Sequence, residues 1–384
     1  MEPTNYTTMI PDHTNYSSIQ DYTNVTKTDE AHSYLLLLNQ IAFPITCVVG
    51  SIGNLLVIFT IWRVNRLHTV MYFVLGSLAM ADLLLCLFFL PFILQELYNG
   101  EKWVHGQAAC KIVFYVYLTS CVVSILSLTA VSIERFVAVR YPLKSRRYLT
   151  LGNAKIMVMV IWIVGAIYAT PALYAYNIAD QVRDGEVVYN CYLRLPTYTA
   201  FQVWFLLYYM IPLCLIPITI ISLCYIAIIQ TIFSRAMPGE QQLSKMKDDT
   251  RETNGVDDKS RKESAKKKKE LKQLIAMLVL IIVLFMLCWF PYFAFFVLWS
   301  FKAFYWSFEV EKVFNFINLL AIMNSAMNPL IYAFFSPVFR TSAVWAITSL
   351  FRRGNTGRPS QLNYRTTMTT GTSVTRNRNA STVA

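Results

Sequence analysis

Charged residues are scarce in this chain. Only 15% of its 384 residues are Asp, Glu, Lys or Arg, whereas 55% are hydrophobic. Soluble domains carry roughly 25% charged residues, so a chain of this composition cannot cover a surface that faces water. A disordered protein, a fibrous protein and an ordinary cytosolic enzyme are therefore poor interpretations, and we expect no catalytic residues. The composition favours a protein with several membrane-spanning helices.

Two other features are absent. The first 30 residues are polar and have no apolar core, so they do not resemble a cleavable signal peptide, and the first membrane span is expected to act as the insertion signal. The sequence contains no parallel or inverted internal repeat. Because membrane transporters are usually built from such repeats, a transporter is the more distant alternative.

Seven stretches are long and apolar enough to cross a bilayer, which requires about 20 such residues. They are residues 34–62, 70–98, 107–140, 152–176, 197–233, 268–300 and 307–334. Prolines inside them, such as Pro91 and Pro291, are tolerated in a membrane because neighbouring helices satisfy the freed backbone groups. The predicted fold class is therefore an all-α membrane protein, a seven-transmembrane helix bundle spanning residues 34–335.

The charge distribution predicts the orientation. With the N terminus outside, 7 of the 34 basic residues lie outside and 27 inside, whereas 12 of the 22 acidic residues lie outside. An excess of Lys and Arg marks cytoplasmic loops, and an odd number of spans then puts the C terminus inside. Residues 1–33 would form an extracellular N terminus glycosylated at the sequons of Asn5, Asn15 and Asn24. The net charge of +12 thus indicates topology and affinity for anionic lipid, not nucleic-acid binding.

Two of the eight cysteines lie at the predicted outer face, Cys110 at the start of the third span and Cys191 in the loop before the fifth. The outside is oxidising, so we expect a disulfide that holds this loop over the mouth of the bundle. The alternative is a pair of unbridged thiols.

Asp82 lies in the middle of the second span, where an ionisable group is costly and marks a functional site by default. Asn324, Asn328 and Tyr332 follow one another at four-residue spacing in the seventh span, so they share one helix face. Together with Ser124 of the third span they provide oxygen donors that suit a small cation such as sodium. The alternatives are a polar channel filled with water and a protonated Asp82 that hydrogen-bonds to a neighbour.

Two further motifs lie near the inner half of the bundle. Glu134 and Arg135 end the third span, where the acid can hold the arginine as an ion pair; an ordinary interfacial arginine is the simpler interpretation. In the sixth span Trp289 precedes Pro291, which indicates either packing around a kink or a hinge that carries an aromatic lever.

Several short motifs occur in order, one set in each span. They are Gly53-Asn54, Leu78-Ala79-Met80-Ala81-Asp82, Cys110, Glu134-Arg135-Phe136, Trp162, Pro217, Tyr225, Cys288-Trp289-Phe290-Pro291 and Asn328-Pro329-Leu330-Ile331-Tyr332. The chain in this respect resembles the rhodopsin-like (class A) G-protein-coupled receptors, neuropeptide receptors among them, from about residue 34 to residue 351.

The resemblance implies a role for each set of residues. It implies a disulfide between Cys110 and Cys191, and a sodium site that favours the inactive state. That site would consist of Asp82, Ser124, Asn324 and Asn328. The activation switch would consist of Glu134, Arg135, Ile125, Pro217, Tyr225, Phe285, Trp289 and Tyr332.

Two departures from the family pattern bear on this switch. Phe136 replaces the usual tyrosine after the arginine, and Leu271 stands where some members have an acid that clamps the arginine. Glu270 is one residue away. We therefore expect a weakly locked inactive state.

The segments beyond the bundle have distinct expected roles. Residues 336–351 resemble a short amphipathic helix on the membrane surface. The third inner loop, about 234–268, has mixed charge and is expected to be disordered; its lysine run would meet anionic lipid or a G protein. The tail, 352–384, is rich in Ser and Thr and is expected to be disordered and to recruit arrestin-type partners when phosphorylated.

The ligand is constrained by two substitutions relative to other members. Tyr117 occupies the position where amine receptors have an aspartate, and Ile322 occupies that of the retinal-binding lysine. The acidic outer face favours a basic ligand, so a short basic or amidated neuropeptide is predicted, and a lipid or another small molecule is the alternative. The predicted ligand-binding residues are Gln95, Tyr117, Tyr292, Phe293, Phe296, Phe314 and Asn318.

Overall fold

The structure is a computed structural model, and it describes residues 22–99, 102–183, 186–194, 197–249, 256–301 and 308–351. The chain divides into two units, Met1–Ala346 and Ile347–Ala384. The first unit contains the helical bundle. The described part of the second unit is the end of one helix, at Phe351.

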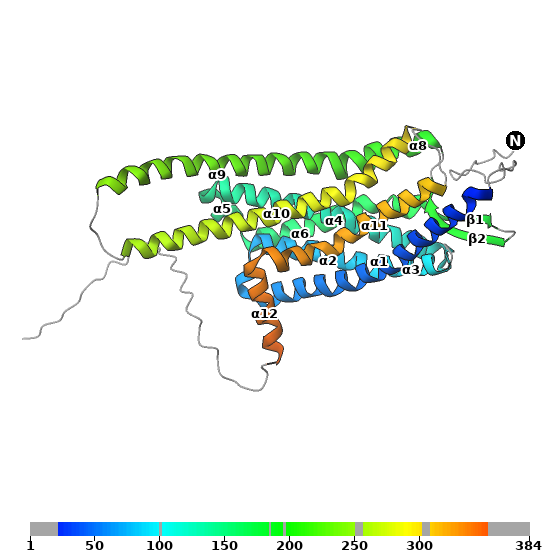
Figure 1. The fold of residues 1–384 in the computed structure, drawn as a ribbon, viewed down its shortest axis with the longest axis horizontal. Helices are drawn as coiled ribbons and strands as arrows, with labels where there is room; N and C mark the ends of the chain where they lie inside the picture. Colours follow the sequence, from blue (N-terminus) through cyan, green and yellow to red (C-terminus); the bar gives the residue numbers. More distant parts are fainter. Residues whose placement is uncertain are drawn as a thin grey trace, which may run out of the picture. The chain divides into compact units, whose positions relative to one another are not determined.

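Seven segments of the described chain are helical, long and apolar enough to cross a membrane, and they run side by side (Figure 1). They are Leu37–Arg63, Val70–Tyr98, Gly106–Arg140, Leu151–Ala175, Trp204–Ile232, Gln273–Ser300 and Phe316–Phe335. The helices that contain them are α1 (Tyr22–Arg63), α2 (Val70–Leu84), α3 (Leu90–Tyr98), α4 (Gly106–Arg140), α6 (Leu151–Ala169), α7 (Ala172–Ala175), α9 (Ile216–Asp249), α10 (Val256–Ser300) and α11 (Phe308–Phe335). The predicted seven-transmembrane helix bundle is confirmed.

Prolines interrupt three of the spans. The second span contains a π-helical segment, η3 (Leu85–Phe89), immediately before Pro91. The fourth span breaks at Pro171, between α6 and α7. The fifth span begins with α8 (Tyr198–Val203) and continues as a longer π-helical segment, η4 (Trp204–Leu215), which contains Pro212. Because proline lacks an N–H group and clashes with the preceding turn, the helix must adjust or end at each of these places.

The core forms where the helices approach closely. The third span, α4, packs on α2, α6 and α9, and α1 packs on α2 and α11. Gly53 makes the contact between α1 and α11 possible, because a Cβ atom there would lie 2.8 Å from the Cβ atom of Pro329. The two helices can therefore approach this closely only with glycine at this point.

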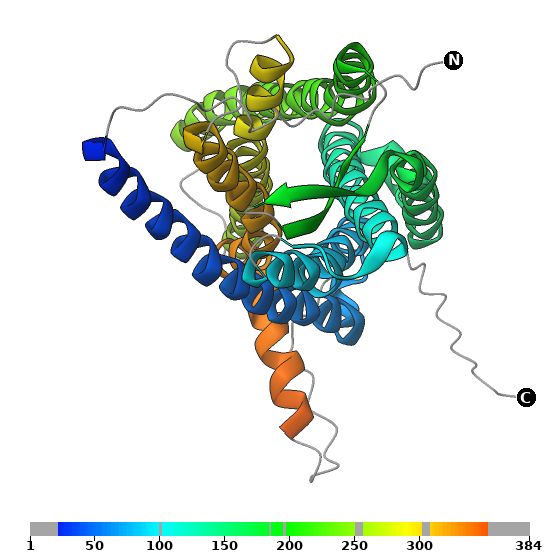
Figure 2. The ribbon, with the colours of Figure 1, turned by 90° about the vertical axis from the view of Figure 1, so that its right-hand side faces the viewer.

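An antiparallel hairpin closes one end of the bundle, and the predicted all-α description does not include it. Strand β1 (Tyr176–Arg183) pairs with β2 (Glu186–Leu193), with Ile178 opposite Cys191. Figure 2 shows both strands lying across the space between the helix ends. We call this end of the bundle the hairpin end.

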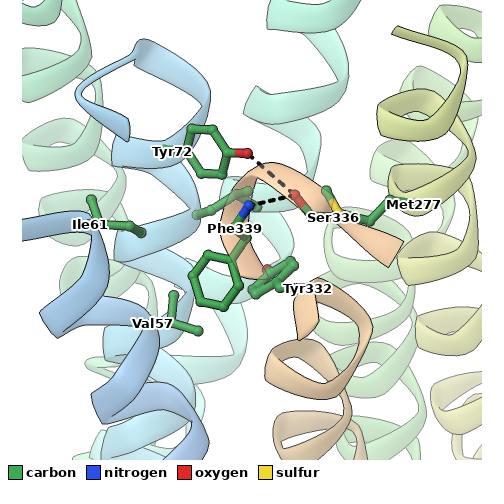
Figure 3. A pocket seen from close by; sticks show the side chains of 8 residues that line it. Val57, Ile61, Tyr72, Met277, Tyr332, Ser336 and Phe339 are labelled. Carbon is green, nitrogen blue, oxygen red and sulfur yellow. Dashed lines mark hydrogen bonds between the residues drawn. The ribbon is translucent and has the colours of Figure 1, made fainter. Parts of the chain in front are cut away.

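Helix α12 (Pro337–Phe351) lies at the other end of the first unit and corresponds to the predicted amphipathic helix. Ser336 caps its start, because the Ser336 hydroxyl accepts a 3.2 Å hydrogen bond from the backbone N–H of Phe339. The Tyr72 hydroxyl lies 3.5 Å from the same oxygen and links the cap to α2 (Figure 3). These residues border a small pocket whose other lining residues are Val57, Ile61, Leu75, Met277 and Tyr332.

The third inner loop differs from its prediction. Disorder is predicted for about 234–268, but α9 continues to Asp249 and α10 begins at Val256. The physical reason is composition, since the Lys, Glu, Gln and Met residues of this stretch are good helix formers. Only residues 250–255 of the loop lie outside the described residues. The predicted tail, 352–384, and the sequons at Asn5 and Asn15 also lie outside them, whereas Asn24 falls at the start of α1.

Candidate functional site: the hairpin end and the bundle interior

The hairpin is fastened to the bundle by the predicted disulfide. Cys110, at the start of α4, is bonded to Cys191 of β2, so this prediction is confirmed. Gln107 adds polar contacts one turn earlier: its side-chain oxygen accepts from the Ile178 N–H at 2.8 Å, and its amide donates to the Tyr176 carbonyl at 3.3 Å. The hairpin is therefore held in place over the helix ends.

The loop before α4 adds a second attachment. The backbone N–H of Trp103 donates to the carbonyl of Tyr189 on β2 at 2.7 Å. The Trp103 ring is buried and its indole N–H donates to the Gly106 carbonyl at 3.0 Å. Gly106 adopts φ of 79°, a left-handed conformation that glycine tolerates at little cost. This turn lets the loop carry Trp103 under the hairpin.

Four tyrosines from four elements meet beneath the hairpin. They are Tyr117 of α4, Tyr176 of β1, Tyr209 of η4 and Tyr292 of α10, and every pair of them lies within electrostatic reach. We call this group the tyrosine cluster. Burial raises the pKa of Tyr176, so its hydroxyl stays protonated at physiological pH. The cluster therefore offers hydrogen-bond donors and acceptors but no charge.

The structure brings most of the predicted ligand-binding residues together around this cluster. Tyr292 packs against Phe296 at 4.8 Å between ring centroids, and Phe296 packs against Phe314 of α11 at 5.7 Å. Tyr117 instead stacks on Phe89 at 4.4 Å. Phe293 is buried beside Tyr209 at 6.1 Å. Sequence reasoning missed three contributors, namely Tyr176, Tyr209 and Phe89.

Two predicted ligand-binding residues are less central. Gln95 is exposed near the end of α3, and Asn318 is half-buried in α11. No hydrogen bond in the described part of the chain joins either one to the tyrosine cluster. Their roles in ligand binding remain predictions.

The predicted sodium residues lie together in the bundle interior. Asp82, Ser124, Asn324 and Asn328 are all buried, and the Asn328 amide donates to one carboxylate oxygen of Asp82 at 2.8 Å. The second carboxylate oxygen of Asp82 and the Ser124 hydroxyl are buried without a well-formed hydrogen bond to a described group, and the Ser325 side chain lies next to the carboxylate. Buried oxygens without partners are what a small cation or water requires, so these residues fit a sodium ion.

Ser120 is a candidate that sequence reasoning missed. It lies one helical turn before Ser124 on the same face of α4. Its side chain is fully buried, and its hydroxyl has no hydrogen-bond partner among the described residues. The four-residue spacing of the two serines was the signal that could have revealed it. Groups of three or more His, Cys, Asp or Glu side chains that could hold a transition metal do not occur in the described chain.

The middle of the bundle holds the predicted connector residues. Ile125, Phe285 and Trp289 belong to one buried cluster, and the Phe285 and Trp289 rings lie 6.0 Å apart. Pro217 is buried just after the π-helical segment η4. Three of the predicted connector residues, Ile125, Phe285 and Trp289, are therefore brought together in the core.

The end of α4 opposite the hairpin carries the predicted ion pair. Arg135 donates to both carboxylate oxygens of Glu134, at 2.5 Å and 2.7 Å. Tyr225 of α9 lies within electrostatic reach of Arg135, and its buried hydroxyl lies near the Ser132 side chain without a well-formed hydrogen bond. The Tyr332 hydroxyl of α11 is also buried and makes no hydrogen bond to a described residue. These hydroxyls are thus available for a different arrangement of the helices.

A short basic helix follows this ion pair. Arg140, the last residue of α4, is exposed, and helix α5 (Pro142–Tyr148) exposes Lys144, Arg146 and Arg147. Leu143 in the same helix is 84% exposed, the largest value among the exposed hydrophobic residues described. An exposed leucine among cations is a suitable surface for a partner with an acidic rim and an apolar pocket.

A comparison with known families agrees with this geometry. A family model described as the 7 transmembrane receptor (rhodopsin family) matches residues 53–332. The chain belongs to this family. Because the family consists of receptors, the transporter alternative is set aside.

Individual relatives of the receptor are moderately similar. It is 30% identical over 299 residues to the somatostatin receptor type 2 of Mus musculus, covering 78% of this chain and 73% of that receptor. It is 29% identical over 214 residues to the melanin-concentrating hormone receptor 1 of Sus scrofa, covering 55% of this chain and 59% of that receptor. It is 32% identical over 190 residues to the G-protein coupled receptor 54 of Oreochromis niloticus, covering 50% of each. The receptor thus matches about three fifths of the length of the melanin-concentrating hormone receptor.

Proposed function

We propose that the receptor is activated at the cell surface by a short peptide and signals through a heterotrimeric G protein. The observation that carries this proposal is the match to receptors named for melanin-concentrating hormone and somatostatin, both of which are peptides. In this proposal the hairpin end faces the outside and the α12 end faces the cytoplasm. The excess of basic residues in the segments at the α12 end supports that orientation.

The chemistry of the hairpin end favours one kind of peptide. The outer segments carry 12 acidic and 7 basic residues, which steer a cationic ligand toward the mouth. The tyrosine cluster below the hairpin is uncharged, so it suits a neutral group that both donates and accepts hydrogen bonds. A peptide with basic side chains and an amidated terminus combines these two properties. A lipid ligand would use the aromatic rings alone.

The opposite end supports coupling to a G protein. Movement of α10 about Pro291 would carry Phe285 and Trp289 with it and open the inner face beside Arg135. The exposed basic helix α5, with Leu143 at its surface, would then form one side of the docking site. We further propose that the phosphorylated tail binds an arrestin-type partner and that α12 rests on membrane lipids.

We also propose that a sodium ion stabilises the inactive arrangement. Its ligands would be Asp82, Ser120, Ser124, Asn324 and Asn328, whose buried oxygens support such a site. When bound, the ion neutralises the Asp82 carboxylate inside the membrane. The residues themselves join α2, α4 and α11, so filling the site favours one packing of these three helices over another.

The test is a G-protein activation assay in cells that express the receptor. The library contains basic peptides in paired forms, each with a carboxamide or a free carboxylate at its C terminus. Arg135→Ala serves as the signalling control, with surface expression measured in parallel. The proposal is supported if the amidated member of a pair activates the G protein and this activation is lost in Arg135→Ala. Silence to every peptide, together with a response to a lipid, would overturn the peptide assignment.

A further inference from the structure

Two tyrosines join the fourth and fifth spans at the hairpin end. Tyr168 lies in the last turn of α6, and Tyr208 lies in the π-helical segment η4. Their rings stack with centroids 4.4 Å apart and planes 10° apart. Each hydroxyl also donates a hydrogen bond to the backbone carbonyl of the other tyrosine. We call this reciprocal pair the tyrosine clasp.

Neither carbonyl in the clasp has the i+4 N–H donor of an α-helix, although the i→i+5 pattern of η4 offers the Tyr208 carbonyl the N–H of Leu213. The α-helical partner of the Tyr208 carbonyl would be residue 212, which is a proline without an N–H group. The Tyr168 carbonyl is among the last four of α6, which ends at Ala169 just before Pro171. The clasp supplies a hydroxyl donor to each.

The surroundings of the clasp make these donors important. The neighbouring residues Ile167 and Leu207 are 69% and 63% exposed, so the seam between the two spans faces the membrane. Hydrocarbon provides no water that could hydrogen-bond to a carbonyl, and an unsatisfied one there is costly. The clasp therefore gives the Tyr168 carbonyl a donor that the end of α6 does not supply, and it ties that carbonyl to η4.

The next residue links the clasp to the ligand site. Tyr209 follows Tyr208 directly but points the other way, and only 6% of it is exposed. It belongs to the tyrosine cluster and packs against Phe293. A π-helical segment turns fewer degrees per residue than an α-helix, and long ones are rare. A return of η4 to α-helical geometry would rotate Tyr209 away from the cluster.

We propose that Tyr168 and Tyr208 are positioning residues for ligand binding. The clasp holds η4 in the register that keeps Tyr209 within the tyrosine cluster. The inference rests on the proposed function, in which the cluster contacts the ligand. According to this inference, two residues that face the membrane and do not touch the ligand contribute to ligand affinity.

The first experiment is a double-mutant cycle on the affinity of an activating peptide. Tyr168→Phe keeps the stacked ring and removes one hydroxyl of the clasp. Tyr174→Phe, an exposed tyrosine at the end of the same span, is the matched control. We expect Tyr168→Phe to weaken affinity by up to about tenfold, the effect of one hydrogen bond, and Tyr174→Phe to leave it unchanged.

The Tyr209→Phe background separates positioning from general stability. If the clasp acts by placing the Tyr209 hydroxyl, Tyr168→Phe changes affinity by less than about twofold once that hydroxyl is gone. Equal losses in both backgrounds, or no loss in either, would overturn the proposal. Tyr208→Phe must behave in the same way as Tyr168→Phe.

A second measurement needs no ligand and so separates this inference from the proposed function. Backbone hydrogen exchange is measured on the purified, ligand-free receptor with Tyr208→Phe and with Tyr174→Phe. Faster exchange confined to residues 208–216 in Tyr208→Phe supports the clasp even if no peptide binds. Unchanged exchange there would overturn it even if a peptide is found.

Discussion

The side-chain amide of Asn328 donates a 2.8 Å hydrogen bond to Asp82 and so joins the seventh span to the second. Only one of the two carboxylate oxygens is engaged in this way; the other is buried and has no partner in the described chain. Asn328 is also the residue before Pro329, which lies inside α11 and cannot donate the hydrogen bond that would continue the helical pattern. A change in the charge of this carboxylate is therefore felt at the same place where the seventh span can bend.

Asp82→Asn should abolish the effect of sodium on agonist affinity. The substitution preserves the shape of the side chain and removes the charge that holds the ion. In the unmodified receptor, replacing an inert organic cation by sodium at constant ionic strength should weaken agonist binding by at least about fivefold, a typical allosteric coupling. Competition binding in the two salts measures the difference. A variant that keeps the full sodium response would remove the cation from the proposal.

The sequence predicts the bundle well because the membrane imposes a simple rule on composition. The second span, for example, is predicted at 70–98, and the structure places it at Val70–Tyr98. The disulfide can also be predicted, since Cys110 opens the third span at the outer face and Cys191 lies in the outer loop before the fifth span. Both predictions rest on constraints that the sequence records directly. A membrane span must be apolar along its length, and a disulfide needs two cysteines on the oxidising side of the membrane.

Other features follow from pairings that local sequence does not reveal. The hairpin could have been found, since Asp184-Gly185 is a strong two-residue turn signal between Arg183 and Glu186, which pair in the register. The π-helical segments are harder, because a proline predicts an irregularity but not its type. The tyrosine clasp joins residues 40 positions apart on two separate helices. Its donors and acceptors become neighbours only after the helices pack.

Loss of the disulfide should destabilise the receptor to the same extent whichever cysteine is replaced. Cys110→Ser, Cys191→Ser and the double variant each open a loop of 81 residues, which costs about 4 kcal/mol in the chain-entropy estimate. Thermal unfolding and surface expression measure the loss, with Cys224→Ala as a control for removing a thiol. A double variant much less stable than either single variant would show that the two thiols act separately.

Glu134→Gln should raise signalling in the absence of ligand. The side chain keeps its shape but loses the charge that holds Arg135 through two short hydrogen bonds. We expect a rise of about threefold to tenfold in agonist-free nucleotide exchange, equivalent to roughly 1 kcal/mol of bias. Arg135→Ala, in contrast, should abolish activation by agonist. An unchanged basal rate in Glu134→Gln would mean that this ion pair does not restrain the receptor.

Ser336→Ala should weaken the attachment of α12. It removes the cap on the Phe339 N–H and the contact with Tyr72 (Figure 3), and a lost N-cap costs about 1 kcal/mol. That loss corresponds to a fall of about 1–2 °C in melting temperature, because the shift per kcal/mol becomes smaller as the domain becomes larger. Thr341→Ala is the matched control, because the Thr341 hydroxyl bonds only to carbonyls of its own helix. Ser336→Thr should restore stability, since threonine also caps, and Tyr72→Phe should show a smaller loss. If Ser336→Ala and Thr341→Ala melt at the same temperature, the cap does not hold the helix.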